Sequence, residues 1–241
     1  LSGSYLGSQS LTYNGDFLYP MKDGGYVLDR NLRTPDSLNF NVVLLDDSLK
    51  KVTALSPFQL DENRRTIYSY SNSLVSYKDG VLYQKNMTDT VFLIDGKSMK
   101  PLLTYDFGRD WLWNIEEIAS DRLAMRDATM EGTHPWRTIS HINPDYVFLN
   151  FKGGSEFFKY VFIDRSQGDS KVVDLRKSAG QSYAITPIRW DEDRLVFSLR
   201  STDVVDYIGE LDDNQYKFRD GTTLEEIESS ENPVLVWVKF K

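Results

Sequence analysis

The tripeptide Asp106-Phe107-Gly108 is one place where residue types in this chain could do chemistry. In protein kinases such an aspartate holds a metal ion at the ATP phosphates, together with a glycine-rich loop, a strand lysine and a His-Arg-Asp catalytic loop. None of these three patterns occurs in the sequence. We therefore interpret the tripeptide as the end of a strand followed by a turn glycine.

The two histidines, His134 and His141, could ligate a metal ion if a third ligand such as Asp127 or Glu131 joined them. Their spacing of seven differs from the HxxxH and HExxH spacings that place two ligands on one face of a helix. The sequence also has no GxSxG, P-loop or EF-hand pattern. We predict no metal site, no cofactor site and no catalytic residue.

Carboxylates are abundant, with 36 Asp and Glu residues. A glycosidase needs two of them roughly 5–10 Å apart, a distance that a sequence does not reveal. Aspartate stabilises turns by accepting hydrogen bonds from its own backbone. We interpret the acids that gather between strand patterns as turn residues: Asp46, Asp47, Asp79, Asp191 and Asp193.

Composition restricts the class of protein. Hydrophobic residues make up 40% of the 241 residues and aromatic residues 13%, which favours a globular protein rich in sheet. The net charge of −8 repels phosphate backbones, so nucleic acid is not an expected partner. No apolar run is long enough to span a bilayer. Cysteine is absent, which excludes disulfides and thiolate metal sites.

A repeated pattern runs along the chain. A β-rich run, an acidic residue, a polar turn and a second β-rich run recur at Asn41–Leu55, Thr90–Tyr105 and Lys159–Leu175, with a partial fourth copy at Pro233–Lys241. A second hairpin precedes each copy, with turns at Lys22–Gly25, Lys78–Gly80, Asn143–Asp145 and Asp191–Asp193. Four antiparallel strands in each repeat are typical of a β-propeller blade.

The repeat predicts one all-β domain over residues 1–241, with about four four-stranded antiparallel blades. The blades are expected near residues 8–57, 66–108, 137–176 and 182–241. Helical insertions are expected near residues 109–132 and 201–232. Asp110 could cap the first of them, and Thr222 with Glu225 has the spacing of a capping box in the second. The alternative for the first insertion is one more hairpin.

Three segments carry a resemblance to a known family: Asp89–Asp95 (DTVFLID), Leu102–Gly108 (LLTYDFG) and Glu231–Lys241 (ENPVLVWVKFK). They resemble six-bladed β-propeller proteins of unassigned function, which Gram-negative gut bacteria export, often as lipoproteins. The resemblance implies a location outside the cytoplasm, in the periplasm or at the cell surface. It also implies a six-bladed ring.

Four blades are visible in the sequence, and the last has no fourth strand after Lys241. Ser2–Leu11 could supply that strand, although Gly3 and Gly7 weaken it. We expect upstream blades to complete a six-bladed ring. The alternative is an unusually small ring of four blades.

Tight turns are expected at one end of the blades and long loops at the other, where binding residues usually lie. Cationic and aromatic residues on these loops could form a pocket for an anionic or sugar-like ligand: Arg30, Arg33, Arg64, Arg65, Lys85, His134, Trp136, Arg137 and Arg200. They could equally be solvated or paired with acids such as Asp61 and Glu62.

These observations predict a non-catalytic extracytoplasmic module that binds or scaffolds a protein or a glycan. The alternative is a glycan-active hydrolase or lyase that uses a carboxylate pair in the propeller channel.

Overall fold

The computed structural model describes residues 8, 10–30, 38–57, 73–85, 87–132, 134–153, 157–177 and 180–240. The chain divides into two compact units. The first unit comprises Leu1–Thr138 with Lys152–Glu156, and the second comprises Ile139–Phe151 with Phe157–Lys241.

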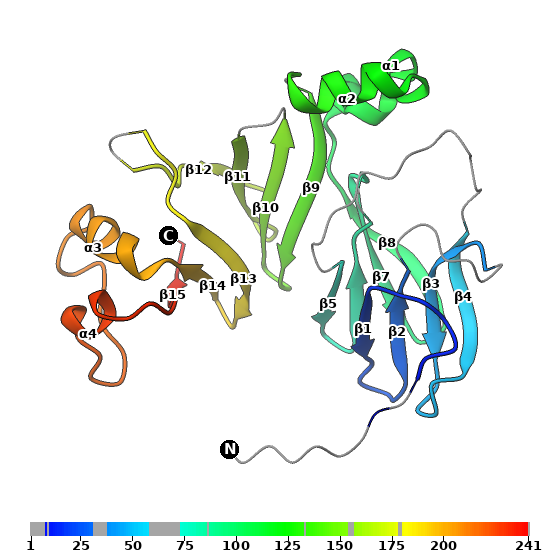
Figure 1. Cartoon of the computed structure of the whole chain (residues 1–241), viewed down its shortest axis with the longest axis horizontal. Helices are drawn as coiled ribbons and strands as arrows, with labels where there is room; N and C mark the ends of the chain where they lie inside the picture. Colours follow the sequence, from blue (N-terminus) through cyan, green and yellow to red (C-terminus); the bar gives the residue numbers. More distant parts are fainter. Residues whose placement is uncertain are drawn as a thin grey trace. The chain divides into compact units, whose positions relative to one another are not determined.

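The first unit holds two four-stranded antiparallel sheets, in which each strand pairs with the next one along the chain (Figure 1). The first sheet consists of β1 (Phe17–Pro20), β2 (Tyr26–Asp29), β3 (Phe40–Leu45) and β4 (Lys51–Pro57). The second sheet consists of β5 (Leu74–Tyr77), β6 (Gly80–Tyr83), β7 (Thr90–Asp95) and β8 (Ser98–Thr104).

The second unit holds most of the third sheet and all of the fourth. The third sheet consists of β9 (Pro135–Ile142), β10 (Tyr146–Gly153), β11 (Phe157–Asp164) and β12 (Ser170–Val173). The fourth sheet has three strands among the described residues: β13 (Ile185–Asp191), β14 (Arg194–Leu199) and β15 (Val234–Val238).

The prediction of an all-β chain with four antiparallel sheets and few helices is confirmed, with fifteen strands among the described residues. The third sheet begins at Pro135, two residues before the predicted start of that repeat, and the fourth sheet has three strands among the described residues. The bounds and the number of blades stay predictions. The single domain over residues 1–241 stays a prediction.

The two sheets of the first unit share an apolar core. Strand β3 reads NVVLL over its five buried positions, so both of its faces are covered. On one face Val42 and Leu44 pack with Leu74 and Val81 of the second sheet. Burying this apolar surface is worth on the order of 25 cal/mol per Å², so the packing of these side chains stabilises the pairing of the two sheets.

The opposite face of the first sheet is covered by the segment that precedes β1. Leu11 and Tyr13 pack against the buried side chains of Leu28 and Val43. Gly15 allows this close approach, because a Cβ atom there would lie 2.4 Å from the Leu28 side chain. The proposed role of Ser2–Leu11 as a completing strand falls mostly outside the described residues, although Leu11 itself packs here on the first sheet.

An aromatic cluster forms much of the core of the second unit. Phe240, two residues beyond β15, stacks on Phe162 with ring centroids 4.5 Å apart. The same ring lies 5.6 Å from Phe148 and 6.4 Å from Trp190. The third and fourth sheets therefore meet around this C-terminal side chain.

The first insertion is helical, and the hairpin alternative is wrong. Two short 3₁₀ turns (Gly108–Asp110 and Leu112–Asn114) precede α1 (Glu116–Ser120) and α2 (Arg122–Met130). The proposed cap at Asp110 is also wrong, because that residue ends a 3₁₀ turn. Asp121 caps α2 instead, since its carboxylate accepts hydrogen bonds from the backbone N–H groups of Leu123 and Ala124 at 2.7 and 3.0 Å.

The second insertion contains α3 (Ser201–Gly209) and α4 (Leu224–Glu228). The capping box of α4 is formed by Thr223 and Glu226, one residue later than predicted. The backbone N–H of Thr222 donates to the carbonyl of Arg219 and so closes the preceding turn, which leaves Thr223 to begin the helix. No described helix has the length and apolar character needed to cross a membrane.

Replacing Phe240 with alanine should destabilise the second unit by about 2 kcal/mol, because the half-buried ring contacts three aromatic side chains. Urea unfolding followed through amide NMR signals of this unit measures the change. The control is Val172→Ala on β12, whose side chain is 81% exposed and whose loss should cost less than about 0.5 kcal/mol. Equal effects of the two substitutions would contradict the packing role of Phe240.

Candidate functional site

The connections between strands in the first unit differ in length at the two ends of the sheets. The turns at residues 21–25, 46–50, 78–79 and 96–97 are short. The connections at residues 30–39, 58–73, 84–89 and 105–134 are longer. Short and long connections alternate along each antiparallel sheet, so they lie at opposite ends. We call the end with residues 30–39, 58–73, 84–89 and 105–134 the long-loop end.

A buried acid lies at the long-loop end, where the first and second sheets meet. Asp29 is the last residue of β2, and Ser73 immediately precedes β5. The Ser73 hydroxyl donates a hydrogen bond to Oδ2 of Asp29, which is 8% exposed. The Ser73 carbonyl accepts a hydrogen bond from the Gln84 backbone N–H at 3.0 Å. This contact therefore joins the ends of β2, β5 and β6.

Burial raises the pKa of Asp29 to about 6. The Ser73 hydrogen bond and the positive charge of Lys85 lower this pKa, and the negative charge of Asp16 raises it, but burial has the largest effect. Burial and the charge of Asp29 also raise the pKa of Tyr83 well above its usual value, so its phenol stays neutral. The site therefore combines a carboxyl group that titrates near neutrality with a neutral phenol.

Hydrogen bonds connect this acid to the first residues of β9. The Gln84 side-chain amide donates to the Thr138 hydroxyl at 2.6 Å, and that hydroxyl donates to the Thr88 carbonyl at 2.8 Å. Further along the same strand, the Trp136 carbonyl accepts a hydrogen bond from Nε1 of Trp113 at 2.7 Å. The start of β9 is thus bonded both to the β6–β7 connection and to the helical insertion.

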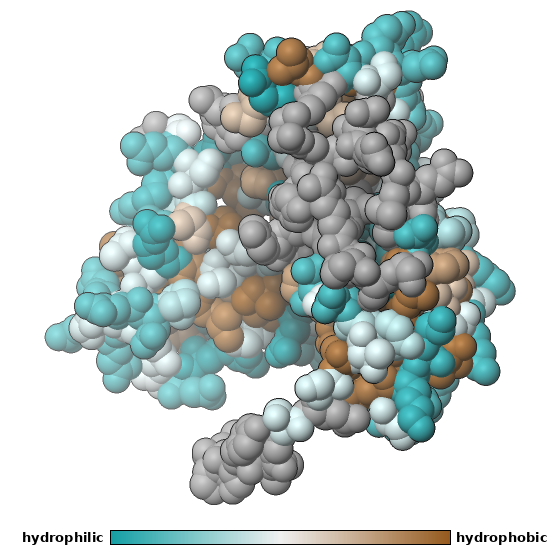
Figure 2. Space-filling view, turned by 45° about the vertical axis from the view of Figure 1, so that its right-hand side comes forward, coloured by the Kyte–Doolittle hydropathy of each residue, from teal (hydrophilic) through white to brown (hydrophobic). Residues whose placement is uncertain are grey.

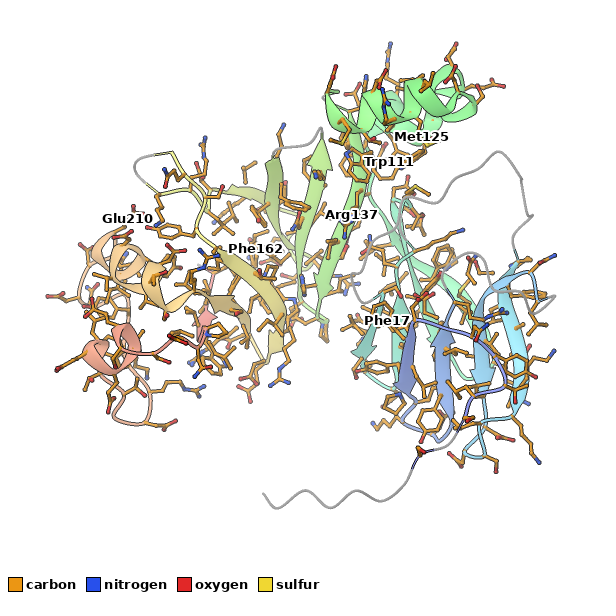
Figure 3. The ribbon with its side chains drawn as sticks, in the orientation of Figure 1. Phe17, Trp111, Met125, Arg137, Phe162 and Glu210 are labelled. Carbon is orange, nitrogen blue, oxygen red and sulfur yellow. The ribbon has the colours of Figure 1, made fainter. Side chains whose placement is uncertain are left out.

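The helical insertion is anchored by buried aromatic groups. Trp111 is 3% exposed and stacks on Phe107 with ring centroids 5.1 Å apart. Figure 3 labels Trp111 and Met125 at this insertion, and Figure 1 shows α1 and α2 beside the beginning of β9. Among the coloured residues in Figure 2, hydrophilic ones predominate, and hydrophobic ones appear in a few groups.

Two of the predicted ligand-binding residues, Arg30 and Lys85, lie beside Asp29. Arg30 is 1% exposed, and its Nε and Nη1 atoms donate to the carbonyls of Asn14 and Leu38, both at 3.1 Å. Its guanidinium group therefore holds backbone segments together. Lys85 is half-buried, and its charge acts on Asp29.

Three more of the predicted ligand-binding residues lie at the start of β9 or just before it: His134, Trp136 and Arg137. Trp136 is 7% exposed, so its ring offers little surface for stacking on a sugar. Lys152 lies over that ring, 5.6 Å from its centroid. Burial lowers the pKa of Arg137, which Figure 3 shows on β9. His134 contacts the Asp110 carbonyl through Nδ1 at 3.2 Å.

Arg200 is exposed in the second unit, where its backbone N–H donates to the Ala184 carbonyl at 3.3 Å. Arg33, Arg64 and Arg65 lie outside the described residues.

Sequence reasoning missed the residues at the centre of the site: Asp29, Ser73, Tyr83, Gln84, Thr138 and Lys152. The sequence offered one signal for this site: an acidic residue ends the otherwise apolar strand Tyr26–Asp29, and that position is buried. Among the described residues, no three His, Cys, Asp or Glu side chains come together in a group that could hold a metal ion.

These features define an all-β protein of successive antiparallel sheets that carries a buried acid among its long connections. The chain belongs to the family described as "Domain of unknown function (DUF4934)", which matches residues 1–239. Its fold is similar to that of a Bacteroides fragilis protein named as a "putative exported protein", with a TM-score of 0.67 and 14% identity. That likeness covers 97% of this chain and 67% of the other. The search among curated proteins found no match.

Replacing Thr138 with valine should destabilise the first unit by about 2 kcal/mol. The two side chains have similar shapes, but valine leaves the Thr88 carbonyl and the Gln84 amide without the hydroxyl that bonds them. Urea unfolding followed through amide signals of the first unit measures the loss.

The matched control is Thr104→Val on β8, where an exposed hydroxyl bonds to that of Thr90 at 3.1 Å. This substitution should cost less than about 0.5 kcal/mol. A Thr138→Val protein as stable as the control would show that the hydrogen-bonded chain does not hold β9 in place.

Proposed function

We propose that this chain is a binding or scaffolding module that acts outside the cytoplasm and holds a protein or a glycan at the long-loop end of its first unit. The observation that carries the proposal is the difference between the two ends of the sheets. Short turns occupy one end, and long connections that are hydrogen-bonded to residues of β2 and β9 occupy the other. Binding residues usually lie on loops that a rigid scaffold holds in place.

The chemistry of the long-loop end suits a polar or anionic ligand. Lys85 and Arg137 are half-buried there, and Lys152 lies over Trp136. Partly buried cations interact more strongly with an anionic group than exposed ones, because less water screens them. The net charge of −8 makes a nucleic acid an unsuitable ligand.

We further propose that the four sheets are blades of a six-bladed β-propeller whose remaining blades belong to a longer protein. Two features support this: the repeated four-stranded antiparallel sheets and the likeness to a longer chain named as exported. The same name supports a location outside the cytoplasm. A chain of four blades that closes on itself is the competing arrangement.

A second candidate function is glycan hydrolysis or elimination with Asp29 as the acid. Such enzymes need a carboxyl group that keeps its proton near neutral pH and a second carboxylate nearby. Asp29 has a pKa of about 6, and Asp16 is close enough to raise it. With Asp29 only 8% exposed, a substrate would have to displace the Ser73 contact to reach it.

The binding proposal is tested on an array of neutral and acidic glycans, probed with the purified chain. We expect a bound glycan whose Kd increases at least about tenfold in Lys85→Ala, which removes a cation from the long-loop end. The control is Lys97→Ala in the short β7–β8 turn, at the opposite end of the same sheet, and its Kd should not change. Equal losses in both variants would show that binding does not use the long-loop end.

The enzyme candidate is tested by measuring new reducing ends or unsaturated products after incubation with the same glycans. Asp29→Asn should abolish cleavage and preserve binding if Asp29 is the acid. Binding without any product, in the natural chain and in the variant alike, leaves the non-catalytic module as the function.

A further inference from the structure

We propose that Asn14 is a site of spontaneous covalent modification, at which its side-chain amide is converted into a carboxylate while the protein is folded. The reaction takes place within the first unit and requires no enzyme and no bound ligand, because the reacting groups belong to neighbouring residues of the chain.

The reacting pair is Asn14 with Gly15, the one Asn-Gly dipeptide in the sequence. An asparagine side chain can bring its carbonyl carbon to the backbone nitrogen of the following residue, and holding two reacting groups together in this way accelerates their reaction. A side chain on the following residue crowds that nitrogen, whereas glycine has no Cβ atom and leaves it open. Glycine is therefore the following residue that hinders the reaction least.

The fold itself requires glycine after Asn14. The segment that precedes β1 passes closely over β2, and a Cβ atom on Gly15 would lie 2.4 Å from Cδ1 of Leu28 and 2.8 Å from the Asp29 carbonyl oxygen. A close-packed contact of this kind leaves no room for a larger residue. The same approach that lets this segment cover the first sheet thus creates the reactive dipeptide.

The reacting groups are accessible. Asn14 and Gly15 are both exposed and lie outside the strands, just before β1. Two hydrogen bonds flank the pair. The Asn14 carbonyl accepts from Nε of Arg30 at 3.1 Å, and the Asp16 N–H donates to the Asp29 carbonyl at 2.9 Å. Neither bond involves the Asn14 side-chain amide or the Gly15 nitrogen, which are the groups that react.

Water is the only co-reactant that the conversion needs. The Gly15 nitrogen attacks Cγ of Asn14, so that a C–N bond forms, the bond from Cγ to Nδ2 breaks and ammonia leaves with the proton of the Gly15 N–H. Water then opens the resulting succinimide ring. Its attack at Cγ gives aspartate, and its attack at the main-chain carbonyl carbon gives isoaspartate, in which the chain continues through Cγ. Overall, an amide and a water molecule give a carboxylate and ammonium.

Both products change the segment that covers the first sheet. Each adds a negative charge next to the contact with Arg30. Isoaspartate also lengthens the main chain by one atom between Tyr13, which packs on Leu28 and Val43, and β1. The packing of this segment should therefore loosen in the isoaspartate form.

The experiment follows the purified, folded chain over time at neutral and at mildly alkaline pH. Peptide mass spectrometry measures the fraction of Asn14 that has gained about one dalton, the difference between an amide and a carboxylic acid. Electron-transfer fragmentation distinguishes isoaspartate from aspartate. We expect both products at Asn14, formed faster at the higher pH because the Gly15 nitrogen must give up its proton.

Asn214 is the matched control within the same sample, since it is also exposed but is followed by Gln215. Its conversion should be slower by about tenfold or more, because the Gln215 side chain crowds the attacked position. Equal rates at Asn14 and Asn214 would overturn the proposal. So would an Asn14 that converts in urea and stays intact in the folded chain.

Asn14→Gln keeps an amide but adds a methylene group, which disfavours closure of the ring. This variant should show no gain in mass at position 14 over the period in which the natural chain converts. A gain at the same rate in the variant would contradict attack by the Gly15 nitrogen.

Discussion

The inner strands β2 and β3 of the first unit are buried on both faces, and this burial determines where polar side chains can lie. Strand β3 has five consecutive buried residues, because one face meets the second sheet and the other meets the segment around Leu11 and Tyr13. Strands packed in this way leave little room for polar side chains except at their ends. The buried polar residues Asp29 and Arg30 accordingly lie where β2 ends, and Ser73 contacts Asp29 there.

The two ends of these sheets differ in the hydrogen-bond partners that their connections need. Short turns need only local hydrogen bonds, such as those that the Asp46 carboxylate accepts from the N–H groups of Ser48 and Lys50 at 2.9 Å. Long connections have backbone groups that need partners further away. Arg30 and Thr138 provide such partners, which explains why these polar side chains are buried. Family membership and the likeness to a solved structure assign no activity, so we infer the function from the contacts at the long-loop end of the first unit.

Local sequence patterns predicted most of the fold. Alternating apolar residues around Asp- and Gly-containing turns identify the hairpins, and the spacing of the repeats locates the two helical insertions. The capping box was predicted one residue early because Thr222-Thr223 and Glu225-Glu226 offer two equivalent registers. The site was harder to predict. Asp29 and Ser73 are 44 positions apart and meet only after two sheets have packed together.

The prediction of Arg30 and Lys85 as ligand-binding residues was limited for the same reason, since sequence patterns do not show long-range contacts. Arg30 has the residue type of a ligand-binding group, but its burial and its bonds to two backbone carbonyls depend on contacts that no local pattern encodes. Lys85 was selected for its place on a loop, and the structure adds that its charge acts on a buried acid.

A pH titration from 4 to 7, followed through all backbone amide shifts of the first unit, tests whether its chemistry is concentrated at the long-loop end. We expect the largest shifts at Asp29, Ser73, Tyr83 and Lys85, with one shared midpoint near pH 6. Shifts concentrated in the short turns, with midpoints near pH 4, would contradict it.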